Sequence, residues 1–436
     1  MKRIVLPFLL LTGLIFGQQI KFEEYDLPNG LHVILHQDTS NPVVAVSVSY
    51  HVGSKNEKAN RTGFAHFFEH LLFEGSENIK RGEFFQYVAK AGGQNNANTQ
   101  QDRTYYYEVL PSNQVGLGLW LESERMLHAK VDKEGIETQR KVVKEEKRLR
   151  VDNQPYADAM RRVLWNNLFP KHPYHWSVIG SMEDLDAASE EDYVNFYKTY
   201  YVPDNAVLTI AGDIEIPQVK KMVEDYFGSI PKGSHTIERP NVTEAPATKE
   251  IVVSTEDQNA QVPAVILGYR APKQTDKDAY VLTIISNILS NGESSRIVRT
   301  VQNKKQLALY TGAFLWPLED YGAFLVFGLV NQGVTTDQLL NAVDEEIEKL
   351  KKEGITQKEL DVQINKLEKT FVDSNSTVEG VAESLSDYYL FYHDTNLINT
   401  EIDIYRSITT EDVKRVANQY LNQNQRVRLT VTPDKK

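Results

Sequence analysis

The second half of this sequence repeats the order of strand-like and helix-like segments of the first half, and this repeat restricts the possible folds more than any other feature. Near the end of the first half, the run 206–210 (Ala-Val-Leu-Thr-Ile) is typical of a buried strand, and 427–431 (Val-Arg-Leu-Thr-Val) has the same place in the second half. A chain of 436 residues also exceeds what one hydrophobic core usually supports, so two domains of about 200 residues are expected. The sequence therefore predicts an α+β fold with two homologous domains, each a mostly antiparallel β-sheet with helices packed on one face.

A change of composition marks the boundary between the two predicted domains. Residues 233–249 turn to Pro, Thr, Ser and Gly, with Pro240 and Pro246, a composition that is typical of a linker. We therefore expect an N-terminal domain over residues 20–232 and a C-terminal domain over residues 250–436.

The first residues of the chain indicate export. Residues 1–17 place Lys2 and Arg3 before an apolar stretch that ends at Gly17, which is typical of a secretory signal peptide. The stretch is too short to cross a bilayer comfortably, and an uncleaved membrane anchor is the alternative interpretation. We expect an exported protein that is located in a periplasm and is not stably inserted in the membrane.

Charge and cysteine content exclude several kinds of site. The formal net charge is −12, whereas a protein that follows nucleic-acid phosphates needs a basic surface, so no nucleic-acid partner is expected. The sequence contains no cysteine, which excludes disulfide bonds and a thiolate nucleophile. A bound metal ion would therefore need His, Asp or Glu as its protein ligands.

One helix-like segment, which we expect to begin near Thr62, carries the most specific chemical signal. With His66 at 0° on a helical wheel of about 100° per residue, His70 falls at about 40° and Glu69 at about 300°. Apolar residues fill most of the remaining circumference, which predicts a buried helix with one polar stripe. Histidines at i and i+4 can bind one zinc ion, the glutamate can take a proton from its water, and His-x-x-Glu-His is a metallopeptidase motif. The alternative is that both histidines form hydrogen bonds within the core.

A catalytic zinc ion also needs a third protein ligand, with one position left for water. Val142, Val143 and Leu149 define an apolar face in a highly charged helix-like run. Glu146 lies in the middle of this face and Glu145 lies at its edge, so Glu146 is the expected third ligand. The alternative is a solvated Glu146 on an ordinary surface helix.

These motifs resemble those of the pitrilysin and insulysin family of zinc metallopeptidases, in particular its half-length bacterial type related to the mitochondrial processing peptidase. The resemblance spans essentially the whole chain after the predicted signal peptide. It rests on His66-x-x-Glu69-His70, Glu146 at 76 residues after His70, Gly92-Gly93, Asn96-Ala97, Thr99, Thr104-Tyr105-Tyr106, Tyr200-Tyr201-Val202-Pro203 and Ala211-Gly212-Asp213.

The resemblance implies that one zinc ion per chain is bound by His66, His70 and Glu146, and that Glu69 is the general base. It implies hydrolysis of short unfolded peptides inside a closed chamber, with the peptide added as a strand to a sheet edge. The residues implied in substrate binding are Asn96, Ala97, Asn98 and Thr99. The alternative function is a catalytically silent structural subunit of a membrane-associated complex, which would not need the intact ligands and base.

Some positions depart from the pattern of the family. Members that work alone carry an Arg and a Tyr in the C-terminal repeat, and these positions fall on Gln302 and Leu309 here, with Tyr310 one step later. We therefore expect a heterodimer with a homologous subunit that lacks zinc and supplies the Arg and the Tyr. A homodimer, or an alignment shift that restores Tyr310, is the alternative. Gln139 replaces a common Glu, and its helical face makes it a candidate hydrogen-bond partner of the metal ligands.

Overall fold

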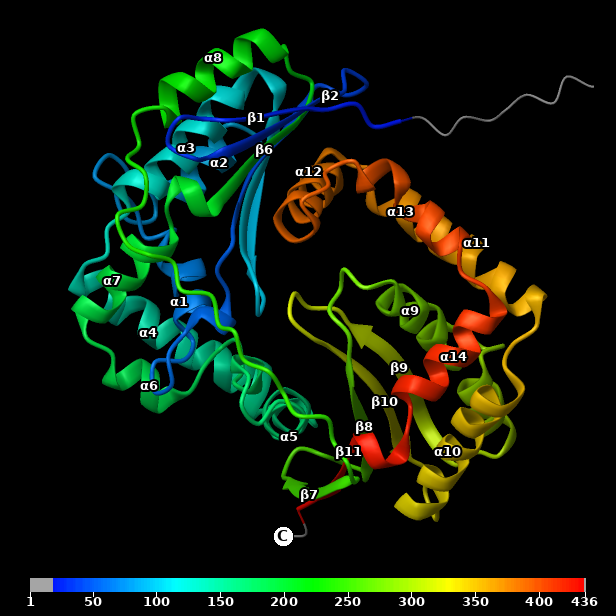
Figure 1. The fold of residues 1–436 in the computed structure, drawn as a ribbon. Helices are drawn as coiled ribbons and strands as arrows, with labels where there is room; N and C mark the ends of the chain where they lie inside the picture. Colours follow the sequence, from blue (N-terminus) through cyan, green and yellow to red (C-terminus); the bar gives the residue numbers. More distant parts are fainter. Residues whose placement is uncertain (1–18, 435–436) are drawn as a thin grey trace, which may run out of the picture.

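The structure, a computed structural model, describes residues 19–434, so the predicted signal peptide at 1–17 lies outside the described residues. The chain forms two units, each built on one β-sheet, that face each other (Figure 1). The N-terminal unit contains the strands β1 (Glu23–Asp26), β2 (His32–Gln37), β3 (Val43–Tyr50), β4 (Gln94–Thr99), β5 (Thr104–Pro111) and β6 (Ala206–Gly212). The C-terminal unit contains the strands β7 (Ile251–Asp257), β8 (Ala264–Ala271), β9 (Ala308–Trp316), β10 (Gly322–Val330) and β11 (Arg426–Pro433).

The two sheets have the same topology except that β1 has no counterpart in the C-terminal sheet. The strand order is β1-β2-β6-β3-β5-β4 in the N-terminal sheet and β7-β11-β8-β10-β9 in the C-terminal sheet. All pairs are antiparallel except β2 with β6 and β7 with β11, which occupy equivalent positions. Across the sheets, the strands β2, β6, β3, β5 and β4 therefore correspond in turn to β7, β11, β8, β10 and β9. The predicted α+β fold with two similar, mostly antiparallel units is confirmed.

Helices surround both sheets, and none among the described residues is long and apolar enough to cross a membrane. The N-terminal unit contains α1 (Phe64–Leu71), α2 (Glu83–Lys90), α3 (Val115–His128), α4 (Lys133–Lys147), α5 (Leu164–Leu168), α6 (Met182–Ala187), α7 (Glu190–Tyr200) and α8 (Ile216–Phe227). The C-terminal unit contains α9 (Lys277–Ser290), α10 (Thr336–Glu353), α11 (Gln357–Ser374), α12 (Val378–Asp387), α13 (Leu397–Arg406) and α14 (Thr410–Tyr420).

Strand β6 shows how the helices cover both faces of the N-terminal sheet. All its residues are buried, although side chains alternate between the two faces of a strand. Leu208 and Ile210 point into the core formed with the helices of the same unit. Val207 and Ala211 point the other way and contact a second buried cluster that includes α12 of the C-terminal unit. The far face of this sheet is therefore covered by the other half of the chain.

The C-terminal sheet is likewise covered on one face by a helix of the other unit. Leu164 and Leu168 of α5, which belongs to the N-terminal unit, pack with Ile266 of β8 and Leu429 of β11. The helices α9, α10 and α14 cover the opposite face. Within each unit the helices lie on one face of the sheet, as predicted. The other face of each sheet is covered by one helix of the other unit: α12 covers the N-terminal sheet and α5 covers the C-terminal sheet. Figure 1 shows α12 beside β6 and α5 near β8 and β11.

The helix α1 begins two residues later than the predicted start. Its first turn follows Gly63, which has a φ of +90° and lies against the backbone of the 179–180 turn, where a Cβ would be only 2.7 Å from the Ile179 carbonyl oxygen. The Glu57 carboxylate caps the helix by accepting hydrogen bonds from the backbone N–H groups of Gly63 (2.8 Å) and Ala65 (2.9 Å). The N-cap position is Gly63 rather than Thr62, and the Thr62 hydroxyl donates to Asp184.

Candidate metal centre

The helix α1 places three polar side chains inside the N-terminal unit. Phe64, Phe67, Phe68 and Leu71 are buried in the core, as the apolar circumference of this segment predicts. The remaining stripe carries His66, Glu69 and His70, and the ring centroids of the two histidines lie 4.9 Å apart. An ionisable stripe in such a helix needs a partner, since burial without one is costly.

That partner comes from α4, which lies beside α1 (Figure 1). Val143 of α4 is fully buried, and Glu146, one helical turn later, faces the same way. The apolar face deduced from the sequence is wrong in part, because Val142 is 43% exposed and Leu149 is 51% exposed. Glu146 points inward as predicted. Of the three apolar residues, Val143 alone is buried on the same side of α4 as Glu146.

His66, His70 and Glu146 form one cluster. Glu146 Oε2 lies 3.0 Å from His70 Nε2 and 3.5 Å from His66 Nε2. The three atoms lie within 4.8 Å of one another, and no other such group of metal-binding side chains occurs within residues 19–434. Neither contact of Glu146 Oε2 has the geometry of a hydrogen bond, so this buried acceptor has no hydrogen-bond donor. Two imidazole nitrogens and one carboxylate oxygen that leave a position open are a donor set that fits catalytic zinc.

The charge states of the cluster suit a metal ligand set. Burial, together with the neighbouring His70, lowers the pKa of His66 to about 4. The His66 imidazole is therefore neutral at neutral pH, which is the form that donates a lone pair to a metal ion. The interaction with His70 lowers the pKa of Glu146, which keeps this carboxylate ionised.

Glu69 lies beside the cluster and is held by a strand. Its Oε2 accepts a hydrogen bond of 2.6 Å from the Thr99 hydroxyl, at the end of β4. Burial raises the pKa of Glu69, and the Thr99 hydrogen bond opposes that shift in part. A raised pKa makes the Glu69 carboxylate a stronger base, which favours the uptake of a proton from water.

The strand β4 forms an edge of the N-terminal sheet next to α1. It pairs with β5 on one side and is the last strand in the sheet order. The strand contains the predicted substrate-binding residues Asn96, Ala97, Asn98 and Thr99. Its free side therefore offers backbone groups close to Glu69, and an extended peptide could pair with them.

Gln139 lies on the same side of α4 as Glu146, but its hydrogen bond goes elsewhere. Its side-chain amide donates to the Glu74 carboxylate, which also pairs with Arg81. The expected contact with the metal ligands is therefore not what the structure shows for Gln139. Arg150 is a neighbour of the cluster that the sequence analysis missed, because its Nη1 lies 3.2 Å from Glu146 Oε1. The spacing of four residues between Glu146 and Arg150 was the available signal.

Of the two positions where the family pattern has Arg and Tyr, Gln302 lies in the helical segment 298–304 and Leu309 lies in the edge strand of the C-terminal sheet. Leu309 and Tyr310 are in β9, and both are about half exposed. The register between β9 and β10 shifts here, because Tyr310 pairs with Leu329 while Ala308 pairs with Val330. Leu309 is thus the extra residue of a β-bulge, which displaces Tyr310 by one position.

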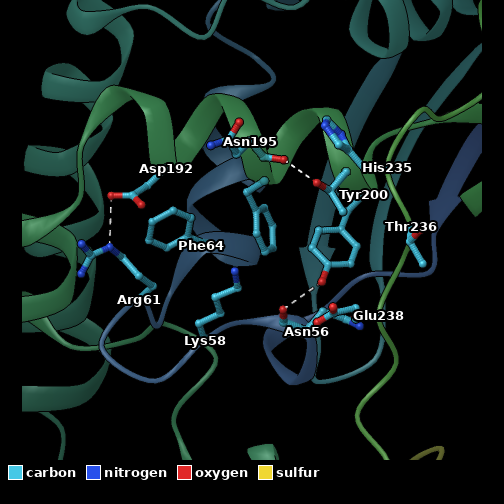
Figure 2. Close-up of a pocket in the computed structure, with 12 residues that line it drawn as sticks. Asn56, Lys58, Arg61, Phe64, Asp192, Asn195, Tyr200, His235, Thr236 and Glu238 are labelled. Atoms are coloured by element: carbon cyan, nitrogen blue, oxygen red, sulfur yellow. Dashed lines mark hydrogen bonds and ion pairs between the residues drawn. The ribbon is translucent and has the colours of Figure 1, made fainter.

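A cavity of about 370 Å³ lies away from the metal cluster, between α7, the loop before α1 and the segment 235–238 (Figure 2). Phe64, Phe196 and Tyr200 supply aromatic rings to its wall, while Arg61 pairs with Asp192 at a distance of 3.1 Å. Lining residues of both charge signs are present, so electrostatics selects no single class of ligand for this cavity. None of the four residues of the predicted site lines it.

Two regions of the chain match known protein families. Residues 32–181 match the insulinase family, peptidase family M16, and residues 187–367 match the inactive domain of peptidase M16. The first region contains the whole cluster from His66 to Glu146.

Similar proteins and structures are named as proteases. Zinc protease PqqE of Helicobacter pylori is 31% identical over 416 residues, covering 95% of this chain and 93% of that protein. The crystal structure of a protease from Helicobacter pylori has 30% identity and a TM-score of 0.90, covering 95% of this chain and 100% of that chain. The periplasmic protease PqqL from Escherichia coli has 18% identity and a TM-score of 0.77, covering 95% of this chain and 48% of that chain. At that identity the likeness to PqqL concerns the fold alone.

Proposed function

The chain belongs to the insulinase family of peptidases, and from that premise we propose that it is a zinc-dependent endopeptidase. The observation that carries this proposal is the convergence of His66, His70 and Glu146 beside Glu69. A silent scaffold subunit would not need all four groups together. The region that matches the inactive peptidase domain, 187–367, contains none of them.

His66, His70 and Glu146 would hold the zinc ion. When bound, zinc supplies a Lewis acid that lowers the pKa of a water molecule to about 7 and polarises a carbonyl group. Glu69 would take a proton from the attacking water and pass it to the leaving amine. Thr99 would hold the Glu69 carboxylate in one orientation through its hydrogen bond of 2.6 Å.

The substrate we propose is a short unfolded peptide that adds to the free edge of β4. Backbone hydrogen bonds supply most of the affinity in this mode of binding, so side-chain specificity would be broad. A peptide along Asn96 to Thr99 would run directly past Glu69, because Thr99 contacts that carboxylate. The backbone of a folded protein is already paired and could not add to this edge. A closed chamber would also exclude substrates that are too large to enter it.

We propose that the active form is a heterodimer. The chain has Gln302 and Leu309 at the positions where an Arg and a Tyr that contact the substrate are expected. The side-chain carbonyl of Gln302 is instead occupied, because it accepts a hydrogen bond of 3.0 Å from the Thr311 backbone N–H. A homologous subunit without zinc would supply both groups and close the chamber. The relation to PqqL supports pairing, because that chain is about twice as long and this chain covers 48% of it.

We also propose that the protein is exported and acts in a periplasm. The support is the basic start and apolar stretch of residues 1–17 in the sequence. Comparing the N-terminal residue of the mature protein, isolated from a cell fraction released by osmotic shock, with Met1 tests this proposal.

The central experiment uses Glu69→Gln and a quenched unfolded peptide. We expect this variant to bind about one zinc ion per chain, as the wild type does, but to have a kcat that is lower by about 10²–10⁴-fold, because an amide cannot accept the proton. Metal analysis and single-turnover cleavage measure the two quantities on the same sample. Near-normal turnover by Glu69→Gln would refute the assignment of the base. Assays of the wild-type chain alone and with its companion subunit distinguish a homodimer from a heterodimer.

A further inference from the structure

A buried arginine at the turn after β4 connects the two units of the molecule. Arg103 is 1% exposed and lies just before β5. Its guanidinium forms ion pairs with Glu383 and Asp387, which are both in α12 of the C-terminal unit. A buried guanidinium requires such partners, because an uncompensated charge in this position would be strongly destabilising. The position of Arg103 is therefore fixed by the other half of the chain.

The same arginine also fixes the end of the edge strand. Arg103 Nη2 donates a hydrogen bond of 3.3 Å to Asn98 Oδ1, and the Arg103 carbonyl accepts one of 2.8 Å from the Gln100 backbone N–H. The guanidinium carbon lies 4.8 Å from the centre of the Tyr105 ring, which adds a cation–π contact on the β5 side. The turn from β4 to β5 is thus held from both sides by one residue.

Thr99 lies inside this clamped segment and contacts Glu69. It follows Asn98, whose side chain accepts the hydrogen bond from the guanidinium, and it precedes Gln100, which is held by the backbone of residue 103. The Thr99 hydroxyl donates to Glu69 Oε2 at 2.6 Å. A movement of the turn would move the Thr99 hydroxyl. Because the orientation of a reacting group within a fraction of an ångström affects the rate strongly, such a movement would matter for a general base.

We propose that Arg103 is a positioning residue: it ties α12 of the C-terminal unit to the turn that orients Glu69 through Thr99. The unit without the metal cluster would thereby take part in the reaction. This inference rests on the proposed function for the role of Glu69, whereas the mechanical link from α12 to the turn does not depend on it.

The test compares Arg103→Met with Arg103→Lys, which keeps the charge but loses the second arm of the guanidinium. The control is Glu24→Gln, which neutralises a carboxylate that accepts a hydrogen bond of 2.6 Å from the Thr395 hydroxyl; this is another contact between the units, but one in β1, at the opposite edge of the same sheet. We measure zinc content, kcat and KM on an unfolded peptide, and amide hydrogen exchange of the metal-free proteins over residues 94–104. Circular dichroism and thermal unfolding confirm that each variant is folded.

We expect Arg103→Met to retain zinc, to lower kcat by at least about tenfold and to change KM by less than about threefold. Amide exchange over 94–104 should be faster in this variant, Arg103→Lys should be intermediate, and Glu24→Gln should match the wild type. If Arg103→Met does not fold, Asp387→Asn, which removes one of the two carboxylate partners, is measured against the same expectations.

Two outcomes would overturn the inference. One is a wild-type level of kcat in a folded variant that lacks the Arg103 ion pairs. The other is an unchanged exchange rate over 94–104, which contradicts the mechanical link even if the wild-type chain proves to have no peptidase activity. A wild-type chain that stays inactive even with its companion subunit, together with faster exchange in Arg103→Met, would instead reject the proposed function and retain the link.

Discussion

Glu145 and Glu146 are adjacent in the sequence but lie in different surroundings. Glu145 is exposed and pairs with Arg148, whereas Glu146 contacts the two imidazoles of α1. The difference follows from the helix, which turns by about 100° per residue and directs neighbouring side chains apart. The sequence was enough to identify Glu146 as the glutamate that points inward. One of the residues used to define the inward face, Leu149, is nevertheless exposed.

We expect Glu146→Gln to lose zinc and Glu145→Gln to retain it. A neutral amide is a poor replacement for an ionised ligand, and the matched substitution at 145 removes the same charge one position away on the helix. Metal analysis after dialysis against a weak chelator should therefore find well under one zinc ion per chain in the first variant and about one in the second. Equal zinc contents in the two variants would contradict the metal role of Glu146.

The limits of sequence analysis at the residue scale concern contacts made through space. The motif identified His66, Glu69 and His70 because their spacing alone places them on one stripe. The contact of Gln139 with Glu74 depends on how α4 packs against the loop after α1, and no periodicity in either segment reveals it. The link from Arg103 to α12 joins residues that are 280 or more positions apart, which a single sequence cannot reveal.

At the scale of elements, strands with strong β propensity were predicted well. The predicted strand 206–210 lies within β6, and the predicted strand 427–431 lies within β11. Strand β7 was not predicted, because it lies at a sheet edge where half-buried and exposed residues alternate and where its later residues are Ser254 to Asp257. The sequence also gave no indication that α12 covers the sheet of the other unit, since an apolar helix face does not identify its partner.

We expect Leu385→Ala in α12 to destabilise the protein by about 2–5 kcal/mol, the usual cost of a buried Leu→Ala change. Leu385 is fully buried against the N-terminal sheet, so the substitution removes methyl groups from the contact between the units. The control is Val372→Ala in α11, a position that is 61% exposed, where a change within about 0.5 kcal/mol is expected. Urea denaturation followed by circular dichroism measures both free energies of unfolding. A cost as small at 385 as at 372 would mean that α12 contributes little to the N-terminal core.

At the scale of the whole molecule, a second buried charge network joins the units. Lys55 is 2% exposed and contacts Asp102 (2.8 Å) of its own unit and Glu319 (2.6 Å) and Asp320 (3.2 Å) of the C-terminal unit. His51 Nε2 lies 2.9 Å from Glu319 Oε2. Burial raises the pKa of Glu319, but the contacts with His51 and Lys55 outweigh burial and lower it to about 2.

This lowered pKa predicts how stability depends on acidity. A carboxylate whose pKa is lower in the folded state stabilises the protein above its ordinary pKa of 4.5, and this contribution is lost as the pH falls toward 2. The contribution is on the order of 3 kcal/mol at neutral pH. We expect Glu319→Gln to be less stable at pH 7 and to lose less stability than the wild type between pH 4.5 and pH 2. Parallel stability curves for the two proteins over this range would contradict the assignment.

The exchange of α5 and α12 between the units also affects what happens if the polypeptide is cut. The residues between α8 and β7 form neither helix nor strand, so a protease could cleave there without breaking a sheet. Each resulting fragment would still hold a helix seated on the other, and the pair should remain associated without a covalent connection. Conversely, each half made alone would have a sheet with one uncovered apolar face, so neither half is expected to fold stably by itself.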